Sequence, residues 1–347
     1  GPSERLFMSK NSSPTLEDVA KLAGVSTASI SRALNEPDKV AGSTRKRIEE
    51  AIETLGYTPH FGGRALASRR TNTVGAVIPS MANAMFASGL QAFQEELAKE
   101  RVTLLVATTG FDPEEERRAI KSLVAQGADA LLLIGDARLP ETWAFLDKRR
   151  VPHVVSWCNH TRNGHFFVGF DNANSAGHAA RAAMEMGHRR LGLICGMTAV
   201  NDRARDRRDG VIAAVEKFGQ GARITHMVEA PYLIDEAGAA LAEIMAQPET
   251  PTVILCANDA QAAGAMVRAR DMGLRLPQDI SFVGFDDIGL ARLVTPALTT
   301  VRVPQTEMGR GAARLLLDMV AGKTGLTSQT LETELIHRAS LVPPHKA

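Results

Sequence analysis

The residues best suited to chemistry lie near the N-terminus, between Thr15 and Asn35. Gly24 permits a tight turn between two short helices, which the apolar spacing predicts at residues 16–23 and 27–34. The second helix begins with small hydroxyl side chains, which can enter a DNA groove and reach phosphates. Arg32 lies about one and a half turns further along and can hydrogen-bond a guanine edge. The spacing favours a DNA-binding helix-turn-helix over the alternative, a small helical bundle used for protein contact.

Three helices must hold these side chains in place. Thr15 can cap the first helix, with Asp18 completing an acidic capping box, and Ser26 can cap the second. A third helix is expected from about Ser43 to Leu55, ending at Gly56. Apolar positions on the three helices suffice for one small core. They are Leu16, Val19, Ala20, Ala23, Val25, Ile30, Leu34, Ile48, Ala51, Ile52 and Leu55.

From Thr73 onward the pattern changes. Apolar runs of strand length alternate with amphipathic helical segments in two series, over residues 73–156 and 173–285. This βαβ alternation predicts two doubly wound lobes, each a parallel sheet covered by helices. Ligands bind such sheets at the carboxyl ends of the strands, so two lobes that face each other would form a cleft there. The expected fold is multi-domain: an all-α helix-turn-helix domain plus an α/β two-lobed domain.

Composition excludes several other classes of protein. The chain has 347 residues, which suits two or three domains, and its formal net charge is only +1. Residues 1–72 hold 11 Lys and Arg against 8 Asp and Glu, a mild basic excess that permits DNA binding. No apolar run has the length of a membrane span and the start has no signal-peptide core, so a cytoplasmic protein is expected.

Enzymatic, metal and disulfide chemistry are not expected. Gly322-Lys323-Thr324 resembles the end of a phosphate-binding loop but follows a helix and lacks the leading glycine. His153, His160 and His165 lack metal-ligand spacing on one element and are interpreted as solvated loop histidines. Cys158, Cys195 and Cys256 are scattered among apolar residues, which predicts buried, reduced thiols. No cofactor or metal ion is expected.

Ordered landmarks along nearly the whole chain carry a family resemblance. The chain resembles the LacI/GalR family of bacterial transcription regulators, whose effector domain is similar to periplasmic binding proteins. The landmarks besides Thr15–Asn35 are Thr44-Arg45, Leu55-Gly56-Tyr57-Thr58-Pro59, Arg64-Ala65-Leu66, Val74–Pro79, Gly169–Asn172, Gly187–Arg190, Asn258-Asp259, Gly284–Asp287 and Pro296–Val301.

The resemblance assigns DNA contacts to individual residues. Thr27 and Ala28 match the two variable base-reading positions, and Arg32 matches the arginine typical of this helix. Leu66 matches the hinge leucine that wedges into the minor groove, and Arg64 follows that groove beside it. This hinge is hypothesised to be disordered without DNA; the alternative for Leu66 is a buried leucine. Phosphate contacts are expected from Ser26, Ser29, Ser31 and Asn35, with Thr15 and Tyr57 assisting.

The resemblance also places a small-molecule effector between the lobes. The matching positions are Phe86, Trp157, Arg207, Asn258 and Asp286, with Asn83, Asp112, Arg138 and Tyr232 as weaker candidates. Packing of the aromatic rings, or a salt bridge between Arg207 and Asp286, is the alternative interpretation. A sugar or sugar derivative acting as inducer is favoured, because Met85 beside Phe86 leaves one ring where a purine would want two. A purine or sugar-acid corepressor, and a sugar-binding receptor that does not bind DNA, remain alternatives.

The same resemblance implies the domain boundaries and the assembly. The expected parts are a tag remnant and disordered N-terminus (1–14), the helix-turn-helix domain (15–59), a hinge (60–72), and an effector-binding and dimerisation domain (73–347). Its N-lobe covers about 73–172 and 304–331, and its C-lobe about 173–303 and 332–347. A homodimer on palindromic operator DNA is expected. The C-terminus has no heptad tail, so a tail-bundled tetramer is not expected.

Overall fold

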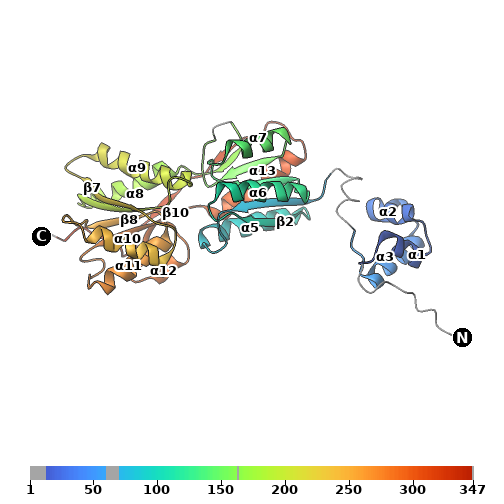
Figure 1. The fold of residues 1–347 in the computed structure, drawn as a ribbon, viewed down its shortest axis with the longest axis horizontal. Helices are drawn as coiled ribbons and strands as arrows, with labels where there is room; N and C mark the ends of the chain where they lie inside the picture. The colour runs from blue at the N-terminus through green and yellow to red at the C-terminus, as the bar shows by residue number, and fades with distance from the viewer. Residues whose placement is uncertain (1–12, 60–69, 162–163, 346–347) are drawn as a thin grey trace. The chain divides into compact units, whose positions relative to one another are not determined.

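The computed structural model describes residues 13–59, 70–161 and 164–345. The chain divides into two compact units, residues 1–71 and 72–347 (Figure 1), which are treated separately below. The expectations for the N-terminal residues 1–12 and for hinge residues Arg64 and Leu66 lie outside the described residues.

The described residues of the first unit form a domain of three α-helices that matches the predicted helix-turn-helix. It contains α1 (Leu16–Ala23), α2 (Thr27–Asn35), the short helix η1 (Pro37–Lys39) and α3 (Gly42–Leu55). Thr15 and Asp18 form the predicted capping box at α1, and Gly24 ends α1 with a φ of 67°. Val19, Ile30 and Ile48 are among the buried residues of its core.

One predicted core residue of this domain is wrong. Leu34 is 36% exposed, whereas Ala33 packs against the core. The apolar side of α2 runs through Ile30 and Ala33, so Leu34, in the last turn before the helix ends at Asn35, is left at the surface.

The second unit contains two α/β lobes, which confirms the predicted fold class (Figure 1). The N-lobe sheet has the order β11-β5-β4-β3-β1-β2, and all of its pairs are parallel. Its strands are β1 (Thr73–Ile78), β2 (Thr103–Thr108), β3 (Ala130–Ile134), β4 (His153–Ser156), β5 (Phe167–Gly169) and β11 (Gln329–Thr330). Its helices are η2 (Ala84–Phe86), α5 (Ala87–Lys99), α6 (Pro113–Ala125), α7 (Pro140–Lys148) and α13 (Gln305–Val320).

The C-lobe sheet repeats this arrangement in the order β12-β10-β9-β8-β6-β7, with only the β10–β12 pair antiparallel. Its strands are β6 (Arg190–Cys195), β7 (Arg223–Glu229), β8 (Val253–Cys256), β9 (Ser281–Asp286), β10 (Thr299–Arg302) and β12 (Glu334–Ile336). Its helices are α8 (Asn172–Glu185), α9 (Asp202–Phe218), α10 (Ile234–Met245), α11 (Asp259–Asp271) and α12 (Leu290–Leu293).

The described chain passes between the two sheets at three places. These crossovers lead from β5 to α8, from β10 to α13 and from β11 to β12. Because every parallel strand points its carboxyl end toward the same edge of its sheet, the loops after β1, β3, β4, β8 and β9 are the segments that can line a site between the lobes.

The histidines near β4 correct the prediction of solvated loops. His153 begins β4 and is 7% exposed, and its Nε2 lies 2.9 Å from Nδ1 of His165. His165 in turn stacks on Trp143, with ring centroids 4.5 Å apart. Only His160, whose side chain is 56% exposed, fits the sequence interpretation. Apolar residues surround the start of β4, so strand formation carries His153 inward.

Buried histidines make the stability of the fold sensitive to acid. Burial lowers the pKa of His153 and of His188 below the usual 6.5. His188 contacts Thr252 Oγ1 and the Val342 carbonyl, both at 2.7 Å, and so fastens the C-terminal segment to the C-lobe. A histidine with a lowered folded pKa binds fewer protons when folded, so its contribution to stability is complete above the unfolded pKa and is lost as the pH falls.

We therefore expect the free energy of unfolding to fall between about pH 7 and pH 5, by up to about 1.4 kcal/mol per pH unit for each histidine. Urea denaturation at several pH values measures this. His188→Gln keeps both hydrogen-bonding groups without titrating, so it should flatten the dependence. An equally steep dependence in that variant would contradict the assignment to His188.

Candidate DNA-reading helix and interlobe site

Helix α2 presents a polar face and buries the opposite one. Thr27, Ala28, Arg32 and Asn35 are exposed, whereas Ile30 is fully buried. Ser29 and Ser31 are half-buried beside them. The burial of Ile30 in the three-helix core therefore fixes which side of α2 is available to a partner.

The first turn of α2 suits contact with an anion. Ser26 caps the helix, its Oγ accepting from the Ser29 N–H at 3.2 Å, and no acidic residue lies in that turn. The positive end of the helix dipole and the exposure of Thr27 and Ala28 in this turn favour a phosphate. This geometry suits the predicted roles of the serines, which no contact in the structure tests.

The remaining predicted DNA residues differ in their exposure. Thr15 is exposed and its Oγ1 accepts from the Asp18 N–H. Tyr57 is only 8% exposed and belongs to the three-helix core, so most of its ring is structural. A basic run in the first turns of α3, Arg45, Lys46 and Arg47, is not among the predicted DNA contacts, although its charge is plain in the sequence.

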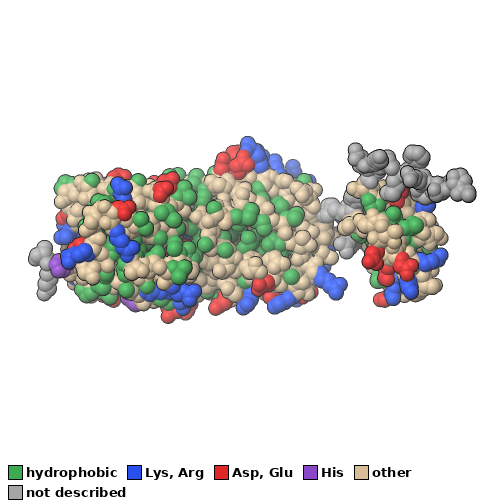
Figure 2. Space-filling model, turned by 90° about the horizontal axis from the view of Figure 1, so that it is seen from below, with side chains coloured by type: hydrophobic (Ala, Val, Ile, Leu, Met, Phe, Trp, Pro, Cys, Tyr) green, Lys and Arg blue, Asp and Glu red, His purple; other side chains and the backbone are tan. Residues whose placement is uncertain are grey.

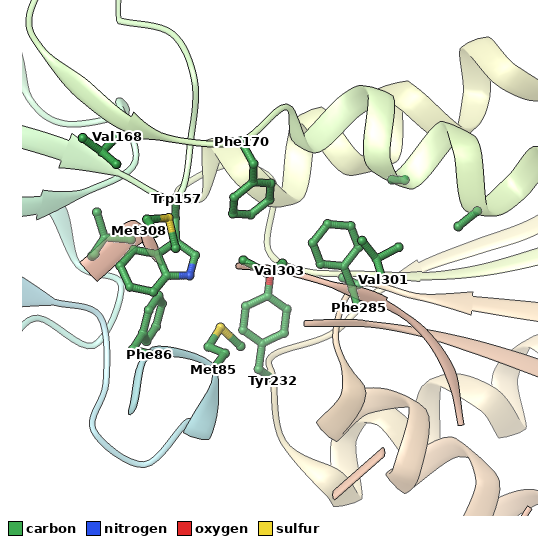
Figure 3. Packing of buried hydrophobic residues seen from close by; sticks show 14 of the residues in the cluster. Met85, Phe86, Trp157, Val168, Phe170, Tyr232, Phe285, Val301, Val303 and Met308 are labelled. Carbon is green, nitrogen blue, oxygen red and sulfur yellow. The ribbon is translucent and has the colours of Figure 1, made fainter. Parts of the chain in front are cut away.

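Two rings of the predicted interlobe site meet at the end of β4. Trp157 and Phe86 pack edge to face, with ring centroids 5.2 Å apart, and both are about 2% exposed. Trp157 has a φ of 66°, and its carbonyl accepts from Asn172 Nδ2 at 2.8 Å, at the first crossover. Its indole nitrogen has no hydrogen-bond partner among the described residues, and Figure 3 shows it turned toward the side of Tyr232.

Arg207 is the central cation of the site. It extends from α9, is 5% exposed, and donates to Asn172 Oδ1 at 2.9 Å and to the Ala257 carbonyl at 2.7 Å. Its guanidinium lies 3.8 Å from the centre of the Phe285 ring. These contacts place it between the first crossover and the carboxyl ends of β8 and β9.

Asp286 is the matching acid. It ends β9, is 2% exposed, and its Oδ1 has no hydrogen-bond partner in the described part of the chain. Burial raises its pKa well above the usual range, and the charge of Arg207 acts in the opposite direction. A buried carboxylate with an unused acceptor is costly and is a common feature of binding sites.

The other predicted effector residues divide into two groups. Tyr232 lies near Arg207 and Asp286. Its hydroxyl accepts a hydrogen bond from Asn201 Nδ2 at 3.1 Å, and its ring packs edge to face on Phe111, with ring centroids 5.9 Å apart. Asn258 is buried and caps α11 through the Gln261 N–H, so its Oδ1 already has a partner.

Arg138 and Asp112 have local structural contacts instead. Arg138 forms an ion pair with Glu116 at 2.8 Å and lies over the Trp143 ring. Asp112 is exposed and caps α6 through the Glu114 N–H. Asn83 is half-buried at the N-cap position of η2.

More aromatic rings line the site than sequence reasoning selected. Phe170 and Phe285 join Phe86, Trp157 and Tyr232, so rings come from both lobes (Figure 3). Phe111 packs against Tyr232 and adds a further ring. Because several rings lie near Phe86, the presence of Met85 beside it is not a reason to disfavour a purine. Phe170 and Phe285 lie within quoted landmarks, but their pairing at 6.1 Å depends on the first crossover and β9 meeting in space.

The three cysteines are buried and free, as predicted. Burial raises the pKa of Cys158 and Cys195 to about 12 and raises that of Cys256 further. We expect none of them to react with Ellman's reagent in the folded protein and all three to react in denaturant, because the thiolate is the reactive form. Rapid reaction of even one equivalent in native buffer would contradict this assignment.

The described residues contain neither a metal-binding cluster nor a membrane-spanning helix. No group of three or more His, Cys, Asp or Glu side chains there could hold a metal ion. No helix among them is both long enough and apolar enough to cross a membrane.

Family models match both parts of the chain. Residues 15–60 match the model described as bacterial regulatory proteins, lacI family, and residues 180–341 match the periplasmic binding protein-like domain. The HTH-type transcriptional repressor CytR of Escherichia coli K12 is 31% identical over 328 residues, covering 94% of this chain and 96% of the relative.

Solved structures agree over the same length. A LacI-family regulator from Silicibacter pomeroyi has a TM-score of 0.87 at 25% identity, covering 95% of this chain and 99% of that one. The transcriptional regulator CelR, solved as a cellobiose complex, has a TM-score of 0.68 at 30% identity, covering 94% and 99%. The chain belongs to the lacI family of bacterial regulatory proteins: it is a DNA-binding transcription regulator and not an enzyme.

Proposed function

We propose that the chain is a homodimeric repressor that binds a palindromic operator and is controlled by a small molecule held between its lobes. The exposed face of α2 carries the DNA-reading part of the proposal. Thr27, Ala28 and Arg32 stand on that face, while Ile30 anchors the helix in the core. Arg32 reads a guanine, Ala28 offers only an apolar contact, and the basic start of α3 binds phosphates.

The site between the lobes supports a ligand with paired hydroxyl groups. Asp286 offers a buried acceptor and Arg207 a buried donor, which together suit a vicinal diol. Trp157 adds an indole N–H and an apolar ring. The related CelR binds cellobiose in its solved structure, which is consistent with a sugar or sugar derivative. We propose that this ligand acts as an inducer.

A purine-containing ligand is the second candidate. The rings of Phe86 and Trp157 on one lobe and of Tyr232 and Phe285 on the other can enclose a flat base. Both candidates predict a change in operator affinity, so a panel of sugars, sugar acids, purines and nucleosides distinguishes them by which member acts.

An electrophoretic shift tests the DNA-binding part of the proposal. DNA selected from random or genomic fragments by the purified protein should contain an inverted repeat, because a two-fold dimer reads two half-sites. The complex should weaken steeply with salt as phosphate contacts are lost. Failure to retain any sequence at low salt, with or without the ligand panel, would favour a receptor without a DNA role.

An apolar surface on the C-lobe supports the proposed dimer. Exposed apolar side chains lie at the start of α10, on α11 and on α12, and we call them the C-lobe apolar surface. Figure 2, viewed from the side on which α11 and α12 lie in Figure 1, shows hydrophobic side chains gathered on this face. The surface consists of Leu233 (49% exposed), Ile234 (54%), Val267 (53%), Met272 (43%) and Leu293 (80%). A second copy is the occupant that a palindromic operator requires.

Leu293→Asp should therefore weaken the dimer. Placing a carboxylate at the most exposed of these residues opposes burial against an identical surface, where two such charges would approach each other. Sedimentation velocity should show a shift toward monomer, with little change in thermal stability of the monomer. Lys217→Asp, on the exposed part of α9, is the matched control. A dimer of unchanged affinity in Leu293→Asp would assign the interface to another face.

A further inference from the structure

The first turn of α9, in the C-lobe, makes direct contact with the N-lobe. Asp202 is 2% exposed, and its Oδ2 accepts from the backbone N–H of Asp136 at 3.0 Å, just beyond β3. The N–H of Ala137 also contributes to holding its carboxylate. Its Oδ1 accepts from Arg203 Nη1 at 2.9 Å. A single buried carboxylate thus joins the backbone of one lobe to a side chain of the other.

Gly135 shows how close the two lobes come at this point. It directly follows β3 and has a φ of 70°. A Cβ added there would overlap the Arg203 guanidinium and the Asp202 carboxylate. The lobes are therefore so close here that a methyl group on residue 135 would require the Arg203 and Asp202 side chains to shift.

Two further contacts bridge the lobes near the same helix. His160 Nε2 lies 3.0 Å from Asp206 Oδ2, one turn along α9 from Asp202. Asn201, the N-cap of α9, donates to the Tyr232 hydroxyl, and that ring contacts Phe111 of the N-lobe at 5.9 Å. The start of α9 thus joins the lobes and also orients a ring of the candidate site.

We infer that Asp202 is an interlobe latch, which holds the lobes closed through contacts made by the chain itself. Burial of Asp202 costs free energy that its hydrogen bonds must offset. The bond to Arg203 lies within α9, but the bond to the Asp136 N–H is retained only while the lobes are together. Closure therefore does not depend on a bound molecule. An effector then acts by shifting an equilibrium that the latch already biases toward the closed form. This inference concerns the lobes alone and stands apart from the identity of any effector.

Trp157 provides a probe for lobe opening. The chain has two tryptophans, so Trp143→Phe leaves Trp157 as the only one, with its buried indole nitrogen turned toward the side of Tyr232, a residue of the other lobe (Figure 3). Acrylamide quenching of Trp157 in the full-length protein then reports how often the lobes open. Circular dichroism of each variant checks that the fold is retained.

Asp202→Ala and Gly135→Ala should each shift the closed-to-open ratio by about tenfold or more, seen as steeper quenching of Trp157. Gly325→Ala is the matched control: Gly325 also has a φ of 70°, but a Cβ there meets nothing within 4 Å. Gly325→Ala introduces the same backbone strain without the clash, so acrylamide should quench Trp157 in this variant as it does in the parent protein. Asp206→Asn should have a smaller effect, because its partner His160 is solvent-exposed.

A distance measurement between the lobes tests the latch with a variant that is less disruptive to the fold. Spin labels at Lys148→Cys on α7 and Lys217→Cys on α9 report the separation of the lobes, and the buried native thiols stay unlabelled. Labelled chains are diluted with unlabelled ones so that only pairs within one chain are seen. Adding Asp202→Asn, which removes the charge at constant size, should broaden this distance distribution toward longer values.

Two outcomes would overturn the latch. One is unchanged quenching and unchanged distances in all the Asp202 and Gly135 variants. The other is an equal change in Gly325→Ala, which would assign the effect to backbone strain.

Discussion

Arg32→Ala should lower affinity for the selected operator by about 5- to 150-fold while affecting non-specific DNA much less. Arg32 is exposed on α2, two residues beyond the buried anchor Ile30, so its removal leaves the three-helix core intact. A bidentate contact to guanine carries sequence information, whereas a phosphate contact does not. Fluorescence anisotropy with the selected operator and with a scrambled duplex, at one fixed salt concentration, separates the two effects.

Lys46→Ala is the matched control for Arg32→Ala. Lys46 is an exposed cation near the start of α3, where we propose a phosphate contact. Its loss should weaken both duplexes by a similar factor and reduce the salt dependence by about one counterion. If Arg32→Ala behaved in the same way, with equal losses on both duplexes, Arg32 would be a backbone contact and base reading would have to come from elsewhere on α2.

Arg207→Ala should have the largest effect on the sensing domain, with a loss of about 3–5 kcal/mol of stability together with loss of the effector response. Arg207 is buried, and its guanidinium links Asn172, the Ala257 carbonyl and the Phe285 ring. Its removal leaves Asp286 buried without its nearest cation. Urea denaturation measures the first effect, and ligand-dependent operator release measures the second.

Arg207→Met separates packing from charge. Methionine retains the aliphatic stem against Phe285, so this variant should recover part of the stability but none of the effector response. Its stability deficit should grow as the pH rises. The reason is that Asp286, already raised in pKa by burial, favours the protonated form in the folded state, and that contribution is lost as the pH climbs through the folded pKa. A normal effector response in Arg207→Met would show that the guanidinium does not contact the ligand.

Local signals explain why much of the fold was predictable. Thr15, Asp18 and Gly24 act within one helix, and α1 begins and ends where the capping pattern predicts. The apolar runs of the first series, within residues 73–156, likewise correspond to β1, β2, β3 and β4, because these strands lie in a sheet covered by helices. The exposed edge strand β7 and the short strands β5, β11 and β12 lack such runs and were not identified.

The candidate site was less predictable because its contacts come from distant segments. Residues at strand ends were predicted from the family resemblance. Asp112 and Arg138 also follow strands, but Asp112 caps a helix and Arg138 forms an ion pair with Glu116. Asp286 and Asp287 have φ values of 109° and 61°, which no local sequence pattern predicts. The Asp202 contact with the Asp136 N–H joins residues of two lobes, so neither segment of the sequence predicts it.

Coupling between the two sites is the central claim, and titration of operator binding with the ligand panel tests it most directly. The selected operator is held at a concentration near its dissociation constant, and each sugar, sugar acid, purine or nucleoside is added in turn to the full-length protein and to Asp286→Ala. We predict that at least one compound changes operator affinity by about tenfold. Asp286→Ala should bind the operator normally and lose that change. Coupling through this site is contradicted if the active compound shifts operator affinity equally in Asp286→Ala, or if no compound in the panel changes that affinity.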